Sequence, residues 1–295
     1  MSDKRQTASI SDRLFAMLQR LLPHHLLSRG MHWLARLEAD WFRKPFTHWF
    51  IRRFAVDLSE AEETDPDRYP SFNAFFTRAL QPGARSIAAD PEALACPVDG
   101  AISQIGNLHD GQLVQAKGHY FTAAGLLGDR AELAREFSDG LFATIYLAPF
   151  NYHRIHMPCD ARLTEMIYVP GRLFSVNAAT ARTVPNLFAR NERVACLFET
   201  SFGPMAMVLV GALFVGSIET VWAGEITPPH RNAVSHRSFA ANGPRLHKGA
   251  EMGRFNMGST VILLLPKNGA RWDPGLEPGR PVRLGMPLGR TAPGL

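Results

Sequence analysis

Residues 255–266 read FNMGSTVILLLP and place a glycine–serine pair directly before a run of apolar residues. The run is short and closed by a proline, which is typical of a buried β-strand. Ser259 is therefore predicted to stand at the start of a buried strand, with Gly258 before it and Thr260 after it. A hydroxyl group there adjoins a glycine carbonyl that no side chain shields.

Strand-like segments separated by glycine and proline occupy most of the chain beyond residue 90, at intervals typical of hairpins. Besides 259–266, they cover residues 94–106, 140–150, 161–171, 193–200, 205–222 and 281–289. A helix is predicted at 69–80, with Ser71 as its N-cap and Phe72, Phe75 and Phe76 turned inward, and another helical interval at 122–137. The pattern predicts an α+β protein with a mostly antiparallel β catalytic domain.

The composition is that of a globular protein, because 46% of the 295 residues are hydrophobic and only 20% are charged. Cys96, Cys159 and Cys196 are widely spaced and form no CxxC pair, which indicates a reducing compartment. The apolar run at 203–218 is shorter than a bilayer span, and residues 1–13 lack the apolar core of a signal peptide. We therefore expect no segment to cross a membrane.

The excess positive charge is confined to the N-terminal fifth of the chain. Residues 1–54 contain 10 Lys and Arg against 4 Asp and Glu, a net charge of +6, whereas the remaining 241 residues have a net charge of −1. Two amphipathic helices are predicted in this part, one before Pro23 and one at 31–42. Their apolar faces comprise Leu14, Met17, Leu18, Leu21 and Leu22 in the first helix, and Trp33, Leu34, Leu37 and Trp41 in the second.

Basic amphipathic helices with tryptophans suit the surface of an anionic membrane. Two alternatives remain open. The helices could instead pack on the protein core, which is the usual fate of an amphipathic helix. Nucleic-acid binding is a weaker alternative, because no known binding motif accompanies the basic residues.

Three polar groups of residues stand out in the predicted catalytic domain. Asp99 precedes a glycine in CPVDGAI (96–102), where an aspartate in a turn is the ordinary interpretation. His153 and His156 lie three residues apart in FNYHRIHMPCD (150–160), a spacing that two metal ligands could have, although Cys159 and Asp160 complete no known ligand pattern. The third group is the pair Gly258–Ser259 with Thr260.

Together these residues supply an acid, two imidazoles and a hydroxyl, the inventory of a hydroxyl nucleophile with its base and orienting group. The segment NMGSTV lacks the second glycine of a G-x-S-x-G elbow and leads into a strand, which argues against an esterase of that type. The Ser259 hydroxyl could instead attack the carbonyl of Gly258 and convert the amide to an ester. Elimination would then break the chain and leave dehydroalanine, which hydrolyses to a pyruvoyl group.

The chain resembles the bacterial phosphatidylserine decarboxylases, a family of pyruvoyl-dependent, self-processing enzymes. The resemblance covers nearly the whole chain and rests on the order and joint presence of seven segments: FNAFFTRAL (72–80), CPVDGAISQIG (96–106), KGHYFTAAGLLG (117–128), YHRIHMP (152–158), GRLFSVN (171–177), NERVACLFET (191–200) and HKGAEMGRFNMGST (247–260). Met257 stands where the family usually has leucine, a change that conserves volume.

The resemblance implies a role for each candidate residue. Ser259 matches the serine that cleaves the chain after Gly258 and becomes the N-terminal pyruvoyl group of the small chain. His156 matches the base that activates this serine, Asp99 the carboxylate that orients the base, and His153 a histidine of the decarboxylation step. The pyruvoyl group would form a Schiff base with phosphatidylserine and release CO2 and phosphatidylethanolamine, without a metal, a nucleotide or pyridoxal phosphate.

The same resemblance implies an organisation for the chain. Residues 1–60 would form a membrane-facing helical segment and residues 61–295 the catalytic domain, cleaved into a large chain (1–258) and a small chain (259–295). The enzyme would bind peripherally to the cytoplasmic face of the cell membrane, with a homodimer left open. Two rival functions differ in simple tests: a lipid-surface binding protein would stay one uncleaved chain, and a serine hydrolase would be trapped by a serine-reactive phosphonate.

Overall fold

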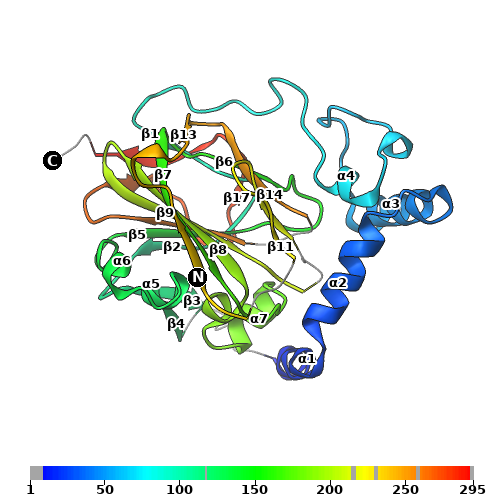
Figure 1. Ribbon diagram of the computed structural model, residues 1–295, viewed down its shortest axis with the longest axis horizontal. Coiled ribbons are helices and arrows are strands. Elements are labelled where there is room, and N and C mark those ends of the chain that lie inside the picture. The colour runs from blue at the N-terminus through cyan, green and yellow to red at the C-terminus, as the bar shows by residue number, and fades with distance from the viewer. Residues whose placement is uncertain (1–8, 117, 214–216, 229–231, 257–259, 293–295) are drawn as a thin grey trace.

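The computed structural model describes residues 9–116, 118–213, 217–228, 232–256 and 260–292. Its helices are α1 (Ile10–Leu21), α2 (His24–Ala35), α3 (Asp40–Phe54), α4 (Phe72–Phe76), α5 (Ala123–Leu126), α6 (Ala131–Arg135), α7 (Ala178–Thr183) and α8 (Leu187–Arg190), with 3-10 turns η1 (Pro66–Arg68) and η2 (Ala240–Asn242). In Figure 1, α1, α2 and α3 follow one another along one flank of the β-sheets. Within the described ranges, no helix has the length and apolar character needed to span a bilayer.

The largest sheet forms the centre of the protein. Its strand order is β12 (Ser235–Ser238), β7 (Ala161–Val169), β8 (Arg193–Thr200), β9 (Gly203–Val210), β15 (Thr260–Leu265), β5 (Leu141–Tyr146), β2 (Gly100–Asn107) and β17 (Pro281–Val282), and β13 (Arg245–Leu246) also pairs with β7. Every residue of β15 is buried, as expected for its apolar sequence. The predicted strand at 259–266 is therefore confirmed over its described residues, at the middle of the sheet.

Three smaller sheets surround the central one. The first has the order β11 (Gly224–Thr227), β10 (Ile218–Thr220), β14 (Glu251–Phe255) and β6 (Arg154–His156). The second has the order β1 (Ala93–Ala95), β18 (Pro287–Thr291) and β16 (Ala270–Trp272), and the third is the hairpin of β3 (Gln112–Ala116) and β4 (His119–Thr122). The pairings between these strands are antiparallel, so the predicted α+β fold with mostly antiparallel sheets is confirmed.

The short helix α4 begins after the predicted N-cap, Ser71, and ends at Phe76, so it occupies only the middle of the predicted interval 69–80. The Ser71 hydroxyl accepts a hydrogen bond from the backbone N–H of Ala74, and Phe72, Phe75 and Phe76 are buried. These three rings join α2 and α3 in a second apolar cluster, separate from the core of the large sheet. Apolar packing thus joins α2 and α3 to α4, whereas α1 is attached through polar contacts of Asp12 and Gln19 with Arg182 and Ser175.

The predicted helices at 31–42 and 122–137 are each divided in the structure. Helix α2 ends at Ala35 and α3 begins at Asp40, so a single helix over 31–42 is wrong. The Asp40 carboxylate binds Arg43 and Lys44 in the first turn of α3, where a negative charge favours a helix start. Between α5 and α6, Gly128 and Asp129 adopt left-handed backbone conformations that end the helix.

Helix α1 turns its apolar face outward. Its first turn is closed by a capping box, in which the Ser9 hydroxyl accepts from the N–H of Asp12 and the Asp12 carboxylate accepts from the N–H of Ser9. The opposite side of the helix buries Ala16 and Gln19. Of the predicted apolar stripe, Leu14, Met17, Leu18 and Leu21 are between 55% and 77% exposed, and Leu22, just after the helix, is 37% exposed.

The close approach of β2 to β5 depends on Gly100. A Cβ atom at this position would overlap the carbonyl oxygen of Tyr146 and lie 3.0 Å from Cγ2 of Ile145. We predict that Gly100→Ala lowers the free energy of unfolding by about 2 kcal/mol, because the backbone of β2 or β5 must move to admit the methyl group. Gly30→Ala, in open space within α2, is the matched control and should raise that free energy by up to about 1 kcal/mol. Urea titration measures both changes, and equal effects would contradict the steric explanation.

Candidate active site

The antiparallel register of three neighbouring strands brings the predicted site segments to one edge of the large sheet. Tyr146, the last residue of β5, pairs with Ala101 of β2 on one side and with Thr260 of β15 on the other. Because adjacent strands lie about 4.8 Å apart, the starts of β2 and β15 are separated by roughly 10 Å along this edge.

Each candidate residue belongs to a segment that enters or leaves this edge. Asp99 immediately precedes β2, and Ser259 immediately precedes β15 in the sequence. The segment with His153 and His156 follows β5. The edge therefore receives all three groups of residues that the sequence analysis singled out.

The proposed cleavage site itself, Gly258–Ser259, lies outside the described residues together with Met257. The nearest described residues on either side of it are Asn256 and Thr260. Thr260 is completely buried between β5 and β9, and Asn256 is buried at the end of β14. Strand β14 pairs with β6, which ends at His156, so the chain that leads to the cleavage site runs beside the histidines.

Asn256 is held by hydrogen bonds from two directions. Its side-chain amide donates to the hydroxyl of Ser217 at 2.8 Å and accepts from the amide of Asn73 at 3.1 Å, and its N–H donates to the carbonyl of Ser217 at 3.0 Å. The Ser217 hydroxyl donates in turn to Glu225, which also binds His32 of α2. A chain of contacts therefore links helix α2 to the segment before Gly258.

His153 is completely buried, and its ring lies 4.0 Å from the ring of Phe76. Its Nδ1 donates to the carbonyl of Asn151 at 2.8 Å, which leaves Nε2 as the unprotonated nitrogen. This Nε2 is buried and has no hydrogen-bond partner among the described residues. Burial, reinforced by the nearby positive charge of Arg78, lowers the pKa of His153 to about 3, so the ring is neutral at neutral pH.

His156 has the same tautomer but a fuller set of partners. Its Nδ1 donates to the carbonyl of Gly249 at 2.7 Å, and its Nε2 accepts from the hydroxyl of Tyr152 at 3.0 Å. Burial lowers the pKa of His156 and raises that of Tyr152 to about 12, so the imidazole is a neutral acceptor and the phenol stays a donor. Gly249 has a φ of +81°, and a Cβ there would lie 2.9 Å from Ile87, so only glycine fits this turn without strain.

Asp99 is bound by an arginine rather than by a histidine. Its two oxygens accept from Nε and Nη2 of Arg85 at 3.0 and 2.6 Å, and one of them also accepts from the N–H of Leu284 at 2.8 Å. Its segment still touches that of His156, whose N–H donates to the carbonyl of Pro97 at 2.9 Å. Between these two described side chains, Asp99 and His156, there is no direct hydrogen bond, and the orienting partner of the His156 ring is the carbonyl of Gly249.

Several residues that complete the site were not predicted from the sequence. Arg85, Tyr152, Gly249 and Asn256 lie in or near the segments on which the resemblance rests. Tyr152 binds His156 four residues further on, whereas the partners of the other three are more distant in the chain. Gly249 was the one local signal, since a glycine that follows the polar residues His247 and Lys248 marks a possible turn with a left-handed backbone.

The described residues at this edge suit a small electrophilic carbonyl group. Two buried polar atoms without described partners lie in its segments, Nε2 of His153 and the hydroxyl oxygen of Thr260. A hydroxyl can donate to a carbonyl oxygen, and a free imidazole nitrogen can exchange a proton. Both atoms are buried, so such a group would react away from bulk water.

Comparison with known proteins identifies the family. A family model described as phosphatidylserine decarboxylase matches residues 72–290, and a second one, described as PSD, matches residues 14–55. The chain is 55% identical over 285 residues to the phosphatidylserine decarboxylase proenzyme of Stutzerimonas stutzeri strain A1501, covering 96% of each protein. It is 56% identical over 279 residues to the proenzyme of Pseudomonas aeruginosa strain LESB58 (94% of this chain, 96% of the relative) and 50% identical over 282 residues to that of Methylococcus capsulatus (96% and 98%). The chain belongs to the phosphatidylserine decarboxylase family.

Proposed function

We propose that this phosphatidylserine decarboxylase makes its pyruvoyl group from Ser259, with His156 as the processing base, and works at the surface of an anionic membrane. The family accounts for the activity, a carboxy-lyase reaction of a proenzyme that uses a serine-derived pyruvoyl group. The observation that carries the assignment to Ser259 is the register of β2, β5 and β15, which gathers the segments of Asp99, His153 and His156 at the start of β15.

His156 has the properties of a base. Its Nε2 carries a lone pair, because Nδ1 holds the proton that is donated to Gly249. Burial keeps the ring neutral, and a neutral imidazole is the form that can accept the proton of a serine hydroxyl. The Tyr152 hydroxyl now occupies this lone pair, so it must give way when the serine binds there.

His153 suits a separate role in turnover. A pyruvoyl group at this edge would supply an electrophilic carbonyl for the substrate amine and a sink for the electrons left when CO2 departs. His153 can hold a proton at Nε2 only briefly, because burial disfavours the charged ring. A proton held there is readily given up, as the protonation of the former α-carbon requires.

Self-cleavage gives the first test of the assignment. The purified enzyme should consist of two chains of 258 and 37 residues, the smaller one with an N-terminal pyruvoyl group. Ser259→Ala should remain one inactive chain, since it lacks the hydroxyl that attacks Gly258. Ser201→Ala, an exposed serine in the turn between β8 and β9, is the control and should be cleaved normally. Intact-mass spectrometry measures the products, and an active wild-type protein of a single full-length mass would falsify the assignment.

The two histidines should fail at different steps. His156→Ala should slow self-cleavage by a factor on the order of 10² to 10⁴, which is the usual contribution of a general base. His153→Asn keeps a donor for the Asn151 carbonyl but removes Nε2, so it should cleave normally and release CO2 slower by a similar factor. Gel analysis of the precursor and CO2 release per cleaved enzyme separate the steps. If both variants fail at the same step, either self-cleavage or CO2 release, the two histidines act as one structural unit.

Asp99 requires a control of its own because it binds Arg85. Asp99→Ala and Arg85→Met break the same ion pair, but only the first removes a carboxylate near His156. A direct role of Asp99 in processing predicts that precursor accumulates in Asp99→Ala and much less in Arg85→Met. Equal accumulation would assign Asp99 to the support of the loop before β2.

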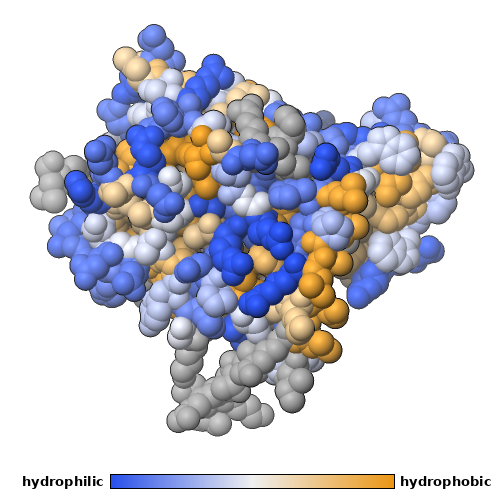
Figure 2. Space-filling model, turned by 60° about the horizontal axis from the view of Figure 1, so that its bottom comes forward, coloured by the Kyte–Doolittle hydropathy of each residue, from blue (hydrophilic) through white to orange (hydrophobic). Residues whose placement is uncertain are grey.

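The N-terminal helices support binding to a membrane surface. Figure 2 shows a strip of apolar residues along these helices, exposed on one face of the molecule. Its tryptophans are also exposed, with Trp33 at 63%, Trp41 at 78% and Trp49 at 49%. Packing on the core, the alternative interpretation of these helices, does not account for the exposed stripe of α1. We assign residues 1–60 to a membrane-facing segment and 61–295 to the catalytic domain.

Vesicle binding tests this assignment. Replacing Leu18, Leu21 and Trp41 together by glutamine should weaken binding to anionic vesicles about 100-fold, since three apolar side chains no longer leave water. The control replaces the same residues by Met, Met and Phe, which keeps them apolar. Sedimentation with vesicles measures binding, and added salt should weaken it because charges are screened within about 10 Å at 0.1 M. Equal sedimentation of both triple variants would assign the strip another role.

A further inference from the structure

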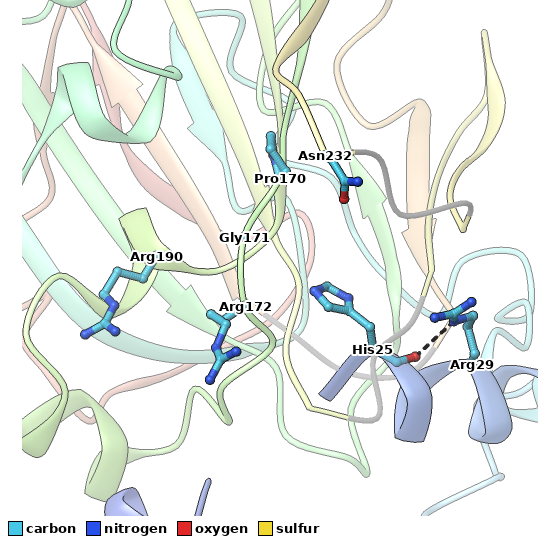
Figure 3. Close-up of a pocket in the computed structure, with 7 residues that line it drawn as sticks. All are labelled: His25, Arg29, Pro170, Gly171, Arg172, Arg190 and Asn232. Carbon is cyan, nitrogen blue, oxygen red and sulfur yellow. Dashed lines mark hydrogen bonds between the residues drawn. The ribbon is translucent and has the colours of Figure 1, made fainter. Parts of the chain in front are cut away.

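A basic hollow lies where helix α2 meets the ends of two strands and a short helix of the catalytic domain. It has a volume of about 490 Å³ and is lined by His25, Arg29, Pro170, Gly171, Arg172, Arg190 and Asn232. Figure 3 shows that its three arginines come from different segments: α2, the chain after β7, and the end of α8. Among the described residues of this lining there is no carboxylate.

The three guanidinium groups are not neutralised within the described part of the chain. Arg29 donates to the carbonyl of His25 at 3.4 Å, and Arg172 donates to the carbonyl of Arg20 at 3.0 Å. Arg172 and Arg190 also lie 6.0 and 5.4 Å from the ring of Phe174. These contacts fix the side chains but leave their charges without a described carboxylate partner. Uncompensated arginines of this kind are suited to phosphate, which they bind through several N–H groups.

The hollow adjoins the apolar strip of the N-terminal helices. The hydrogen bond from Arg172 to Arg20 ties its rim to the last turn of α1. Leu21, Leu22 and Leu26, next to these residues in the sequence, are 77%, 37% and 64% exposed. An anion-binding hollow beside exposed leucines has the two-part chemistry of a phospholipid, with a charged headgroup and acyl chains.

The hollow is separate from the reacting edge, although it lies at the same end of the large sheet. Val169, the residue before Pro170, pairs with Arg193 of β8. Arg193 pairs on its other side with Val210 of β9, and Val210 pairs with Thr260 of β15. Three strand spacings therefore separate the two places, roughly 14 Å. A serine headgroup is only a few bonds long, so one lipid cannot place its amine at Thr260 and its phosphate in the hollow.

We propose that this hollow binds the phosphodiester headgroup of a second anionic phospholipid, which holds the enzyme on the membrane beside the reacting lipid. The proposal rests on the membrane-surface function proposed above and adds a defined headgroup site to it. The acyl chains of the bound lipid would lie along Leu21, Leu22 and Leu26.

The test compares two double variants of equal charge. Arg172→Gln with Arg190→Gln removes two arginines of the hollow, and Arg135→Gln with Arg271→Gln removes two exposed arginines on α6 and β16. The first should weaken binding to phosphatidylcholine vesicles that contain phosphatidylglycerol roughly 30-fold, and the second less than about twofold. Thermal melting checks that both variants are folded. If both double variants weaken vesicle binding equally, the arginines of the hollow contribute only to the overall positive charge, and the proposal is overturned.

A soluble probe distinguishes a headgroup site from a phosphate site. Calorimetry should show saturable binding of dihexanoyl phosphatidylglycerol below its micelle concentration, lost in the Arg172/Arg190 variant. Inorganic phosphate should compete only weakly, because it lacks the chains that contact the leucines. Equal affinity for inorganic phosphate, or no saturable binding, would overturn the lipid site. The same samples are run on a denaturing gel: cleaved enzyme without lipid binding refutes this site alone, whereas an uncleaved chain refutes the proposed processing at Ser259.

Discussion

The hydrogen-bond register of β2, β5 and β15 is the constraint on which the site depends. With Tyr146 paired to Ala101 and to Thr260, the segments before β2, after β5 and before β15 all meet at one edge. A shift of one residue in either pairing would turn every side chain of the shifted strand to the opposite face of the sheet. The apolar residues of β15, all buried, therefore fix the position of the reactive segment through their packing. Gly100 allows the approach of β2 that completes this arrangement.

Much of this was predictable from local sequence. The buried strand after Ser259 and the capped helix with Phe72, Phe75 and Phe76 follow from short-range patterns of apolar and turn residues, and both are confirmed. The break between α2 and α3 was missed, because helical periodicity continues across residues 36–39, whereas α2 ends at Ala35 and α3 begins at Asp40. The same periodicity predicted an apolar face on α1, but it does not distinguish a face that packs on the protein core from one that is exposed, as it is in the structure.

The residues of the site could be predicted from the sequence, but their hydrogen-bond partners could not. His153 and His156 could be named from a motif, yet their tautomers are set by the carbonyls of Asn151 and Gly249, and one of these lies 93 residues away in the chain. The partner of Asp99 likewise comes from Arg85, in a loop that carries no signal of its own. Resemblance transfers roles between aligned positions, whereas hydrogen bonds across loops depend on the folded chain. The role of Asp99 in orienting His156 therefore stays a prediction.

Cleavage before Ser259 would change how the protein refolds, because β15 lies at the centre of the large sheet. Cleavage before Ser259 would put β15 in the small chain, together with β16, β17 and β18, while β5 and β9 on either side of it belong to the large chain. The two products would remain interlocked by the full length of a buried strand, so the nick costs the folded enzyme little. The unfolded enzyme, by contrast, would have lost its connectivity. Its two pieces would have to find each other by diffusion, and the serine that started the reaction would no longer exist. Folding must therefore come first, and an enzyme denatured after maturation should recover far less readily than its uncut precursor.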